Sequence, residues 1–264
     1  MKKIRLDQLV FDRGFTESRE RAKTTVMSGH VFVNGQRADK PGMPVAEDAV
    51  VEVRGDALPF VSRGGYKLDK ALKVFPVDPA GKVCIDCGAS TGGFTDVLLQ
   101  HGAAKVYAVD VGYGQLAWKL RSDERVVNLE RTNLRYVTEE QIPEKLDLAV
   151  MDVSFISIRL VLPAVKALLK PDADYICLIK PQFEAGRDEV GKKGVVRDEK
   201  VHREVVQGIL DFVPTIGMSA VGLDYSPIKG PEGNIEYICH LVNTPGLDRA
   251  IDVAAIVARS HENL

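Results

Sequence analysis

The sequence lacks any long apolar run. No stretch approaches the roughly 18 uninterrupted apolar residues that a helix needs to span a membrane. Near the N-terminus, Asp7 interrupts the apolar residues well before they could form the core of a signal peptide. These two absences argue against a membrane-spanning role, and we expect a soluble protein that stays in the cytoplasm.

Cysteines are also few, with four in 264 residues. Cys84 and Cys87 form a C-x-x-C pair, a spacing found in redox centres and in half of many zinc sites. The pair lies in KVCIDCG, which we predict to be a strand, and in a strand this spacing places two side chains on opposite faces. Because Cys177 and Cys239 also lie in apolar runs, we expect four reduced core cysteines and no metal site.

The chain has almost no net charge, with a formal value of -2 at pH 7. The molecule as a whole therefore does not attract phosphate strongly, and any nucleic-acid binding must come from local clusters of positive charge. Residues 1–30 carry seven lysines and arginines against four carboxylates, an excess of three positive charges. A solvated helical face could have the same composition, so charge alone does not decide the function.

Residues 1–60 have a pattern of their own and are predicted to form a small domain. Leu6 and Leu9 have helical spacing, and Gly14 is a suitable helix end. A second helix, capped by Thr or Ser, is predicted to begin near Thr16.

The pattern then changes from helical to alternating. Residues 30–34 and 49–53 alternate like strands, and Asn34-Gly35 is a strong signal for a tight turn. We therefore predict two short helices followed by a small β unit.

This segment resembles the αL RNA-binding domain that is named after a small-subunit ribosomal protein. The resemblance rests on Arg5, Leu6, Asp7, Leu9, Ser18, Arg19, Ala22, Gly29, Val31, Val33, Asn34 and Gly35. It implies that the second helix and the following turn lay cations along an RNA backbone through phosphate contacts. The RNA-binding residues it implies are Arg5, Arg19, Arg21 and Lys23. The alternative is a charged helix face on a small interaction module.

From residue 82 onward, apolar strand patterns alternate with helical patterns. Strands are predicted in 82–88, 105–110, 125–130, 146–154, 174–180, 218–225 and 235–242, and helices in 92–102, 115–122, 158–170 and 199–213. This alternation implies a mostly parallel sheet covered by helices on both faces. We predict an α/β fold in which residues 61–264 form a Rossmann-like domain with a seven-stranded sheet. Such sheets bind ligands at the carboxyl ends of their strands, near the switch point.

A loop of small residues follows the first of these strands. The strand is predicted to end at Asp86, and the chain then runs through residues 88–93 into a helix that opens at Phe94. Small residues are needed where a ligand must approach the backbone closely. The second strand ends in Asp110, and a carboxylate about twenty residues after the glycine loop suits hydrogen bonding to a ribose diol.

Three enzyme classes share this layout. A dinucleotide site requires a glycine where this chain has Ser90, and the P-loop motif is absent. Residues 88–92 satisfy the G-x-S-x-G of serine hydrolases literally, with Ser90 as nucleophile. The histidines available as its base are His202, His240 and His261. In a hydrolase, however, Asp110 would have no role, and the loop would not follow the first strand of its domain. A glycine turn in an α/β domain without a ligand is a further alternative.

The third class is the methyltransferases, whose pattern D-x-G-x-x-x-G with an acidic residue ending the next strand resembles this sequence throughout. That resemblance implies S-adenosylmethionine as the cofactor. The cofactor-binding residues it implies are Asp86, Gly88, Ala89, Ser90, Gly92, Gly93, Phe94, Asp110 and Asn133.

Four ionisable residues lie where strands end or where the sheet begins: Lys67, Asp152, Lys180 and Glu236. Asp152 and Lys180 close the fourth and fifth strands, so a parallel sheet would place them side by side. An ion pair that only seals the sheet would give the same pattern.

The four residues resemble the catalytic set of the ribose 2′-O-methyltransferases, Lys-Asp-Lys-Glu in this chain order. By that resemblance Lys180, with a depressed pKa, removes the proton of the 2′-hydroxyl. Asp152 and Glu236 orient the lysines, and Lys67 positions the hydroxyl and stabilises negative charge. A base methyltransferase would instead need an N-P-P-type motif or a nucleophilic cysteine, and neither is apparent in the sequence.

Over essentially its full length the chain resembles the TlyA family, also called hemolysin A-like. The motifs that carry this resemblance are SRGGYKL, DCGASTGGFTD, DVSFIS, KPQFEAG and GVVRD. Family members methylate cytidine 2′-hydroxyls in ribosomal RNA, which implies ribosomal RNA or ribosomal subunits as partners and an FtsJ-like methyltransferase domain. The target nucleotide, the ribosomal subunit and the oligomeric state stay open. A noncatalytic RNA-binding or ribosome-assembly protein with a relic fold is the alternative.

Residues 182–197 are predicted to form a long loop beside Lys180. This segment contains Gly186, Gly191, Gly194, Lys192 and Lys193. We expect it to close over the substrate.

Overall fold

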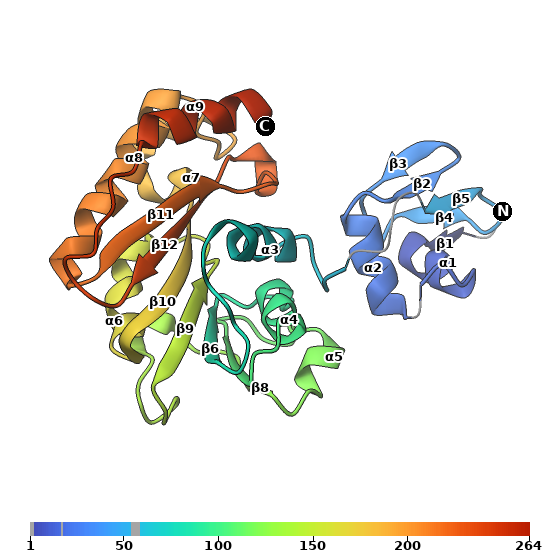
Figure 1. The fold of residues 1–264 in the computed structure, drawn as a ribbon. Coiled ribbons are helices and arrows are strands. Elements are labelled where there is room, and N and C mark those ends of the chain that lie inside the picture. The colour runs from blue at the N-terminus through green and yellow to red at the C-terminus, as the bar shows by residue number, and fades with distance from the viewer. Residues whose placement is uncertain (1–2, 17, 54–58) are drawn as a thin grey trace. The chain divides into compact units, whose positions relative to one another are not determined.

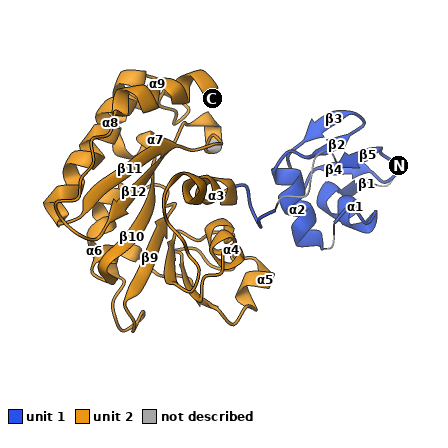
Figure 2. Ribbon diagram, viewed as in Figure 1, with its two compact units in different colours: residues 1–63 blue, residues 64–264 orange. Residues whose placement is uncertain are grey.

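The computed structural model describes residues 3–16, 18–53 and 59–264. The chain divides into two compact units, residues 1–63 and 64–264 (Figure 2). This division lies close to the boundary predicted between residues 60 and 61.

In its described residues, the first unit contains two helices, α1 (Leu6–Asp12) and α2 (Arg19–Met27). Ser18 caps α2 by accepting a hydrogen bond from the backbone N–H of Arg21, so the predicted Thr or Ser cap is confirmed. The apolar faces of both helices enclose a small core that includes Leu6, Leu9 and Val26.

The part of this unit that the structure describes also contains five short strands. They form a two-stranded sheet of β1 (Lys3–Arg5) and β4 (Pro44–Ala46), and a three-stranded sheet in the order β3 (Gln36–Ala38), β2 (Val31–Val33), β5 (Val51–Val53). Asn34 and Gly35 both have positive φ, 50° and 78°, as the predicted tight turn between β2 and β3 requires. The sequence analysis did not predict β1, β3 or β4, whose residues KIR, QRA and PVA lack the run of alternating apolar residues seen in 30–34 and 49–53.

The second unit is built on a seven-stranded sheet in the order β11-β12-β10-β9-β6-β7-β8 (Figure 1). Its strands are β6 (Val83–Cys87), β7 (Lys105–Val109), β8 (Val126–Leu129), β9 (Leu146–Met151), β10 (Leu169–Ile179), β11 (Ser219–Tyr225) and β12 (Tyr237–Val242). The five strands from β10 to β8 are parallel, whereas β12 is antiparallel to both β10 and β11. The predicted mostly parallel, seven-stranded sheet is therefore confirmed.

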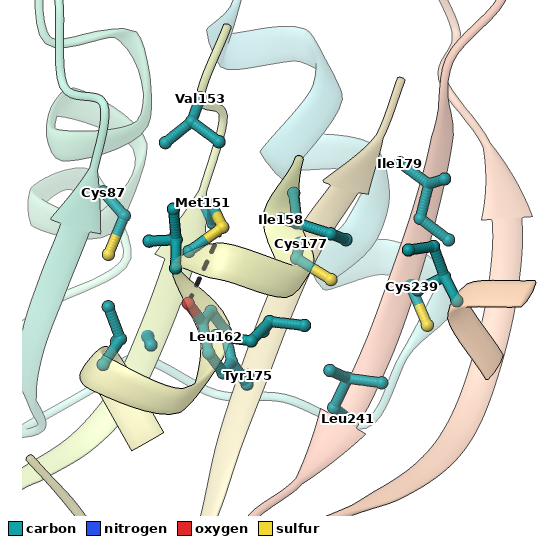
Figure 3. Close-up of a cluster of buried hydrophobic side chains, with 14 of the residues drawn as sticks. Cys87, Met151, Val153, Ile158, Leu162, Tyr175, Cys177, Ile179, Cys239 and Leu241 are labelled. Atoms are coloured by element: carbon teal, nitrogen blue, oxygen red, sulfur yellow. Dashed lines mark hydrogen bonds between the residues drawn. The ribbon is translucent and has the colours of Figure 1, made fainter. Parts of the chain in front are cut away.

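Helices cover both faces of this sheet. Its described α-helices are α3 (Gly65–Val74), α4 (Gly93–Gln100), α5 (Trp118–Arg121), α6 (Leu162–Lys166), α7 (Pro181–Glu184), α8 (Glu199–Phe212) and α9 (Val253–Asn263). Helices α6, α8 and α9 share one buried cluster with the sheet face that carries Cys87, Tyr175 and Cys239. In that cluster the Tyr175 hydroxyl donates to the Met151 sulfur at 3.7 Å (Figure 3).

All four cysteines are free and buried, as predicted. Cys87 points into the cluster of Figure 3, whereas Cys84, three residues earlier, is not part of it. Neighbouring strands place Cys177 opposite Cys239 in register.

The helix predicted over residues 158–170 is only partly present. A 3₁₀ turn (Ile158–Leu160) and the short helix α6 occupy its start, and β10 already begins at Leu169. Leu168 and Leu169 continued the helical spacing in the sequence, but they pack in the core at the beginning of the strand. The sequence analysis also missed α3, which opens at a glycine, a poor helix former, and α9.

Candidate active site

A cavity of about 350 Å³ lies where the parallel strands β6, β7, β8 and β9 end. Its lining residues are Gly88, Ser90, Asp110, Val111, Gln115, Asn133, Leu134, Asp152, Val153, Ser154, Phe155, Ile156 and Val161. Strands β6 and β9 are neighbours in the sheet although they are not consecutive in the chain, which makes this the switch point where α/β sheets bind ligands.

Backbone geometry explains the small residues of the loop after β6. Gly88 has φ +85°, and a Cβ built there would lie 2.9 Å from the carbonyl oxygen of Asp152. Gly92, at φ +94°, is closely covered by the side chain of Leu120. Gly88 therefore lets the loop pass against the end of β9, whereas Gly92 lets it pack against α5.

Asp110 and Asn133 present polar groups to the cavity. The Asp110 carboxylate is held by two backbone donors, Ser90 N at 2.8 Å and Gly112 N at 2.6 Å. Each carboxylate oxygen has a second lone pair, so a fixed Asp110 can still accept from a diol. The Asn133 side-chain oxygen accepts from Arg135 N at 3.1 Å, which orients its amide group.

These polar groups fit a nucleoside cofactor. A carboxylate suits a ribose diol, and an amide suits a base edge. Val111, Leu134, Val153 and Ile156 supply apolar walls between which an adenine ring would lie.

Of the nine predicted cofactor residues, the structure brings Gly88, Ser90, Asp110 and Asn133 to the cavity. The described lining does not include Asp86, Ala89, Gly92, Gly93 or Phe94. That any of the nine contacts a cofactor stays a prediction.

Asp86 is completely buried behind the loop. Its Oδ2 accepts from Thr95 N at 2.9 Å and Thr95 Oγ1 at 2.7 Å, and so ties the start of α4 to the end of β6. Burial raises the pKa of Asp86 to about 7, although both Thr95 hydrogen bonds lower it. Among the described residues, its Oδ1 has no hydrogen-bond partner.

The serine-hydrolase alternative finds no base in the described structure. Ser90 Oγ donates to Gln115 Oε1 at 3.3 Å. Over the residues that the structure describes, none of the three candidate histidines contacts Ser90. His202 contacts the Tyr237 hydroxyl and the Val196 carbonyl. His240 contacts Asp174 at 2.9 Å, and His261 contacts His202 at 3.3 Å.

The four predicted catalytic residues come together beside the cavity. Lys67 Nζ lies 2.6 Å from Glu236 Oε2 and 3.2 Å from Asp152 Oδ2, and Lys180 Nζ lies 2.6 Å from Asp152 Oδ1. Both lysines and Glu236 are buried. The structure thus forms a chain of alternating charges, Glu236, Lys67, Asp152 and Lys180.

The fold explains how four distant segments meet. Asp152 and Lys180 directly follow the adjacent parallel strands β9 and β10, as predicted. Glu236 directly precedes β12, which runs antiparallel and so begins at the same edge where the parallel strands end. Lys67 lies on α3, so the expectation that it stands where the sheet begins is wrong.

In this cluster, the neighbouring charges outweigh burial in setting the pKa values of Lys67 and Asp152. Burial alone lowers the pKa of Lys67, but the charges of Asp152 and Glu236 outweigh it, and the pKa is raised. Burial alone raises the pKa of Asp152, but the two lysines outweigh it, and the pKa is lowered. Lys67 is therefore a fixed cation, which suits stabilisation of negative charge.

Lys180 has a second partner that was not predicted. Its contact with Asp152 Oδ1 has ion-pair distance but not the angle of a hydrogen bond. Its directed hydrogen bond goes to Ser154 Oγ, at 2.9 Å. Ser154 also lines the cavity, so it connects Lys180 to the space beside Asp152.

Phe155 was also missed as a site residue. Its side chain is 90% exposed on the cavity lining, and its backbone has φ +64°, which is unusual for a bulky residue. Both Ser154 and Phe155 belong to DVSFIS directly after β9, so their position after a strand was the signal that could have identified them.

The predicted loop of residues 182–197 is only partly a loop. It contains most of α7 and a 3₁₀ turn (Arg187–Glu189). Asn234 fixes its end by accepting from Val196 N at 3.2 Å and donating to the Gly194 carbonyl at 2.9 Å. That the segment closes over a substrate stays a prediction.

In the first unit, the predicted RNA-binding cations are not all on one face. Arg5 forms two hydrogen bonds to the buried Asp7, at 3.0 and 2.9 Å, and lowers the pKa of that carboxyl. Arg19 and Lys23 are exposed one helical turn apart on α2. Arg21 points elsewhere and donates to the Phe60 carbonyl at 3.3 Å. RNA contact by these four residues stays a prediction.

A second cavity, of about 650 Å³, lies between the end of α3 and strands β11 and β12. Its described lining contains none of the predicted site residues, and its His240 and Asp174 are already paired. The smaller cavity beside the charged cluster is therefore the candidate active site.

Two families of known sequence match this chain. Residues 60–242 match the FtsJ-like methyltransferase family, and residues 4–51 match the S4 domain. The "16S/23S rRNA (cytidine-2'-O)-methyltransferase TlyA" of Mycobacterium tuberculosis is 44% identical over 98% of this chain and 97% of its own length. "Hemolysin A" of Brachyspira hyodysenteriae is 42% identical over 90% of this chain and 100% of its own length.

A solved structure from Streptococcus thermophilus has the same fold. It superimposes with a TM-score of 0.80 at 44% identity, covering 100% of this chain and 97% of its own. In the described part of this chain, no helix is both long and apolar enough to cross a membrane.

Proposed function

The chain belongs to the FtsJ-like methyltransferase family, and from this premise we propose that it transfers a methyl group from S-adenosylmethionine to cytidine 2′-hydroxyls of ribosomal RNA. The observation that carries the proposal is the buried chain of Glu236, Lys67, Asp152 and Lys180 beside a nucleoside-sized cavity. Its cytidine specificity is proposed from the relative of 44% identity.

The residues of the site divide the work. S-adenosylmethionine, when bound, supplies an electrophilic methyl group. Asp110 would hold its ribose diol, and Asn133 would hold its base. Lys180 would take the proton of the attacking 2′-hydroxyl at Nζ after it has released its own proton, and Asp152, 2.6 Å away, would stabilise the ammonium that results.

Lys67 contributes a fixed positive charge. Held between two carboxylates, it keeps its proton and can orient the acceptor hydroxyl while negative charge develops there. Glu236 keeps Lys67 in place from the buried side. Phe155, exposed on the cavity lining, offers an aromatic face to the acceptor nucleoside.

The first unit supports ribosomal RNA as the partner. It matches the S4 domain and carries exposed cations on α2. Because the whole chain is nearly neutral, this unit would supply the local positive charge that RNA binding needs. With such a substrate, the protein would work in the cytoplasm.

The proposal is tested with labelled cofactor and ribosomal RNA or subunits. We expect label transfer by the wild type and a loss of about 10²–10⁴-fold with Lys180→Ala, the usual contribution of a general base. Lys145→Ala, which removes a half-exposed lysine away from the site, is the matched control. Equal transfer by the wild type and Lys180→Ala would reject Lys180 as the base. Absence of transfer to any RNA by the wild type would favour a noncatalytic RNA-binding protein.

A further inference from the structure

Two segments that follow neighbouring strands are linked at three places. Residues 152–157 (DVSFIS) follow β9, and residues 180–184 (KPQFE) follow β10. Lys180 donates to Ser154 Oγ at 2.9 Å, and the rings of Phe155 and Phe183 lie 5.1 Å apart at 49°. Glu184 makes the third link. The segment that lines the cavity, residues 152–157, is therefore connected to residues 180–184 behind it.

Glu184 uses both of its carboxylate oxygens in this link. Oε2 accepts from Ser157 Oγ and Oε1 accepts from the backbone N–H of Ile158, each at 2.7 Å. The Ile158 N–H begins a 3₁₀ turn and has no partner within that turn, so the carboxylate satisfies it. Burial raises the pKa of Glu184, although both hydrogen bonds lower it. Glu184 is therefore part of the local structure, because a solvated surface carboxylate would not be partly buried and hold two protein donors.

The segment that Glu184 holds is strained and lines the cavity. Phe155 has φ +64°, a conformation that a bulky residue keeps only when its surroundings determine it. Val153 and Ile158 anchor the two ends of this segment in the core (Figure 3). Between them, the contacts to Lys180, Phe183 and Glu184 fix its path.

We propose that Glu184 is a positioning residue that holds the 152–157 segment, and through it both the cofactor cavity and the hydrogen bond that Lys180 donates to Ser154. Its effect on catalysis rests on the proposed function, whereas its effect on cofactor binding does not depend on the RNA substrate. Glu184 itself does not line the described cavity.

The full-length protein is tested with Glu184→Ala, Glu184→Gln and Ser157→Ala. S-adenosylhomocysteine is the probe, and its Kd is measured by calorimetry. We expect Glu184→Ala to weaken binding about tenfold, because it removes both hydrogen bonds that hold the cavity-lining segment. Glu184→Gln keeps a carbonyl acceptor and should recover part of the affinity. Ser157→Ala removes one of the two bonds and should weaken binding about threefold.

The rate of single-turnover methyl transfer at saturating S-adenosylmethionine separates positioning from a purely structural role. Glu184→Ala should lower this rate and Glu184→Gln should restore part of it, because both changes act on the segment whose Ser154 accepts the hydrogen bond from Lys180. A loss of thermal stability alone would not change the rate of the folded protein. Glu204→Ala, an exposed glutamate on α8, is the matched control and should change neither quantity.

An unchanged Kd in folded Glu184→Ala overturns the proposal. If Glu184→Ala does not fold, unchanged Kd values in both Glu184→Gln and Ser157→Ala overturn it. If the wild type methylates no RNA, the proposed function fails, while the cofactor measurement still decides the role of Glu184.

Discussion

Replacement of Glu236 by glutamine should destabilise the protein and inactivate it for separable reasons. Glu236 is fully buried and contacts Lys67 Nζ at 2.6 Å, and Gly230 leaves room for its carboxylate because any Cβ there would collide with it. Glutamine has nearly the same shape but no charge, so Lys67 would remain buried with only Asp152 at 3.2 Å. Breaking a buried pair costs about 3–5 kcal/mol, and because Asp152 remains we expect about 2–3 kcal/mol.

A double-mutant cycle tests the magnitude. The free energy of unfolding is measured by urea titration for Lys67→Met, Glu236→Gln and the double variant. The double variant leaves no unpaired lysine, so it should recover about 1–2 kcal/mol relative to Glu236→Gln. It should still be inactive, because the fixed cation is gone. A double variant whose loss of stability equals the sum of the two single losses would refute a direct interaction between the two buried charges.

Three further predictions follow from the cofactor loop and the first unit. Gly88→Ala should lose cofactor affinity and about 1–2 kcal/mol of stability, because φ is +85° and the new Cβ would meet a carbonyl oxygen, as calorimetry and thermal unfolding would measure. Since the folded-state pKa of Asp86 is raised to about 7, its contribution to stability is present below the unfolded pKa of about 4 and is lost as the pH rises through 7. Asp86→Asn should remove that pH dependence from the free energy of unfolding, measured by urea titration between about pH 4 and pH 7. The same pH dependence in the wild type and in Asp86→Asn would reject a contribution from Asp86. Arg19→Ala and Lys23→Ala should each reduce the slope of log affinity for RNA against log salt concentration by about 0.7–0.9, whereas Arg21→Ala should reduce it less. Filter binding measures these slopes, and equal slopes for the wild type and all three variants would contradict a phosphate contact by α2.

The topology of the sheet made part of the site predictable. Asp152 and Lys180 end adjacent parallel strands, so the alternation of strand and helix patterns was enough to place them together. The loop after β6 was recognisable in the same way, because a run of small residues between a strand and a helix is typical of a turn that a ligand approaches closely.

Contacts between loops could not be predicted in this way. The places of Lys67 and Glu236 depend on a helix opened by glycine and on an antiparallel strand, so the resemblance to ribose methyltransferases was needed to group them with Asp152 and Lys180. Ser154, Phe155 and Glu184 act through side-chain packing between two loops, for which the sequence carries no periodic signal. The same limit explains why the apolar spacing of residues 158–170 predicted a helix where the structure has a turn, a short helix and the start of a strand.

Identification of the methylated nucleoside tests the central claim most directly. Ribosomal RNA incubated with the protein and S-adenosylmethionine would be digested to nucleosides and analysed by mass spectrometry. We predict 2′-O-methylcytidine with the wild type and its loss with Lys180→Ala. A nucleoside methylated on its base, or 2′-O-methylcytidine formed equally by both proteins, would contradict the assignment of Lys67, Asp152, Lys180 and Glu236 as a ribose methyl-transfer site.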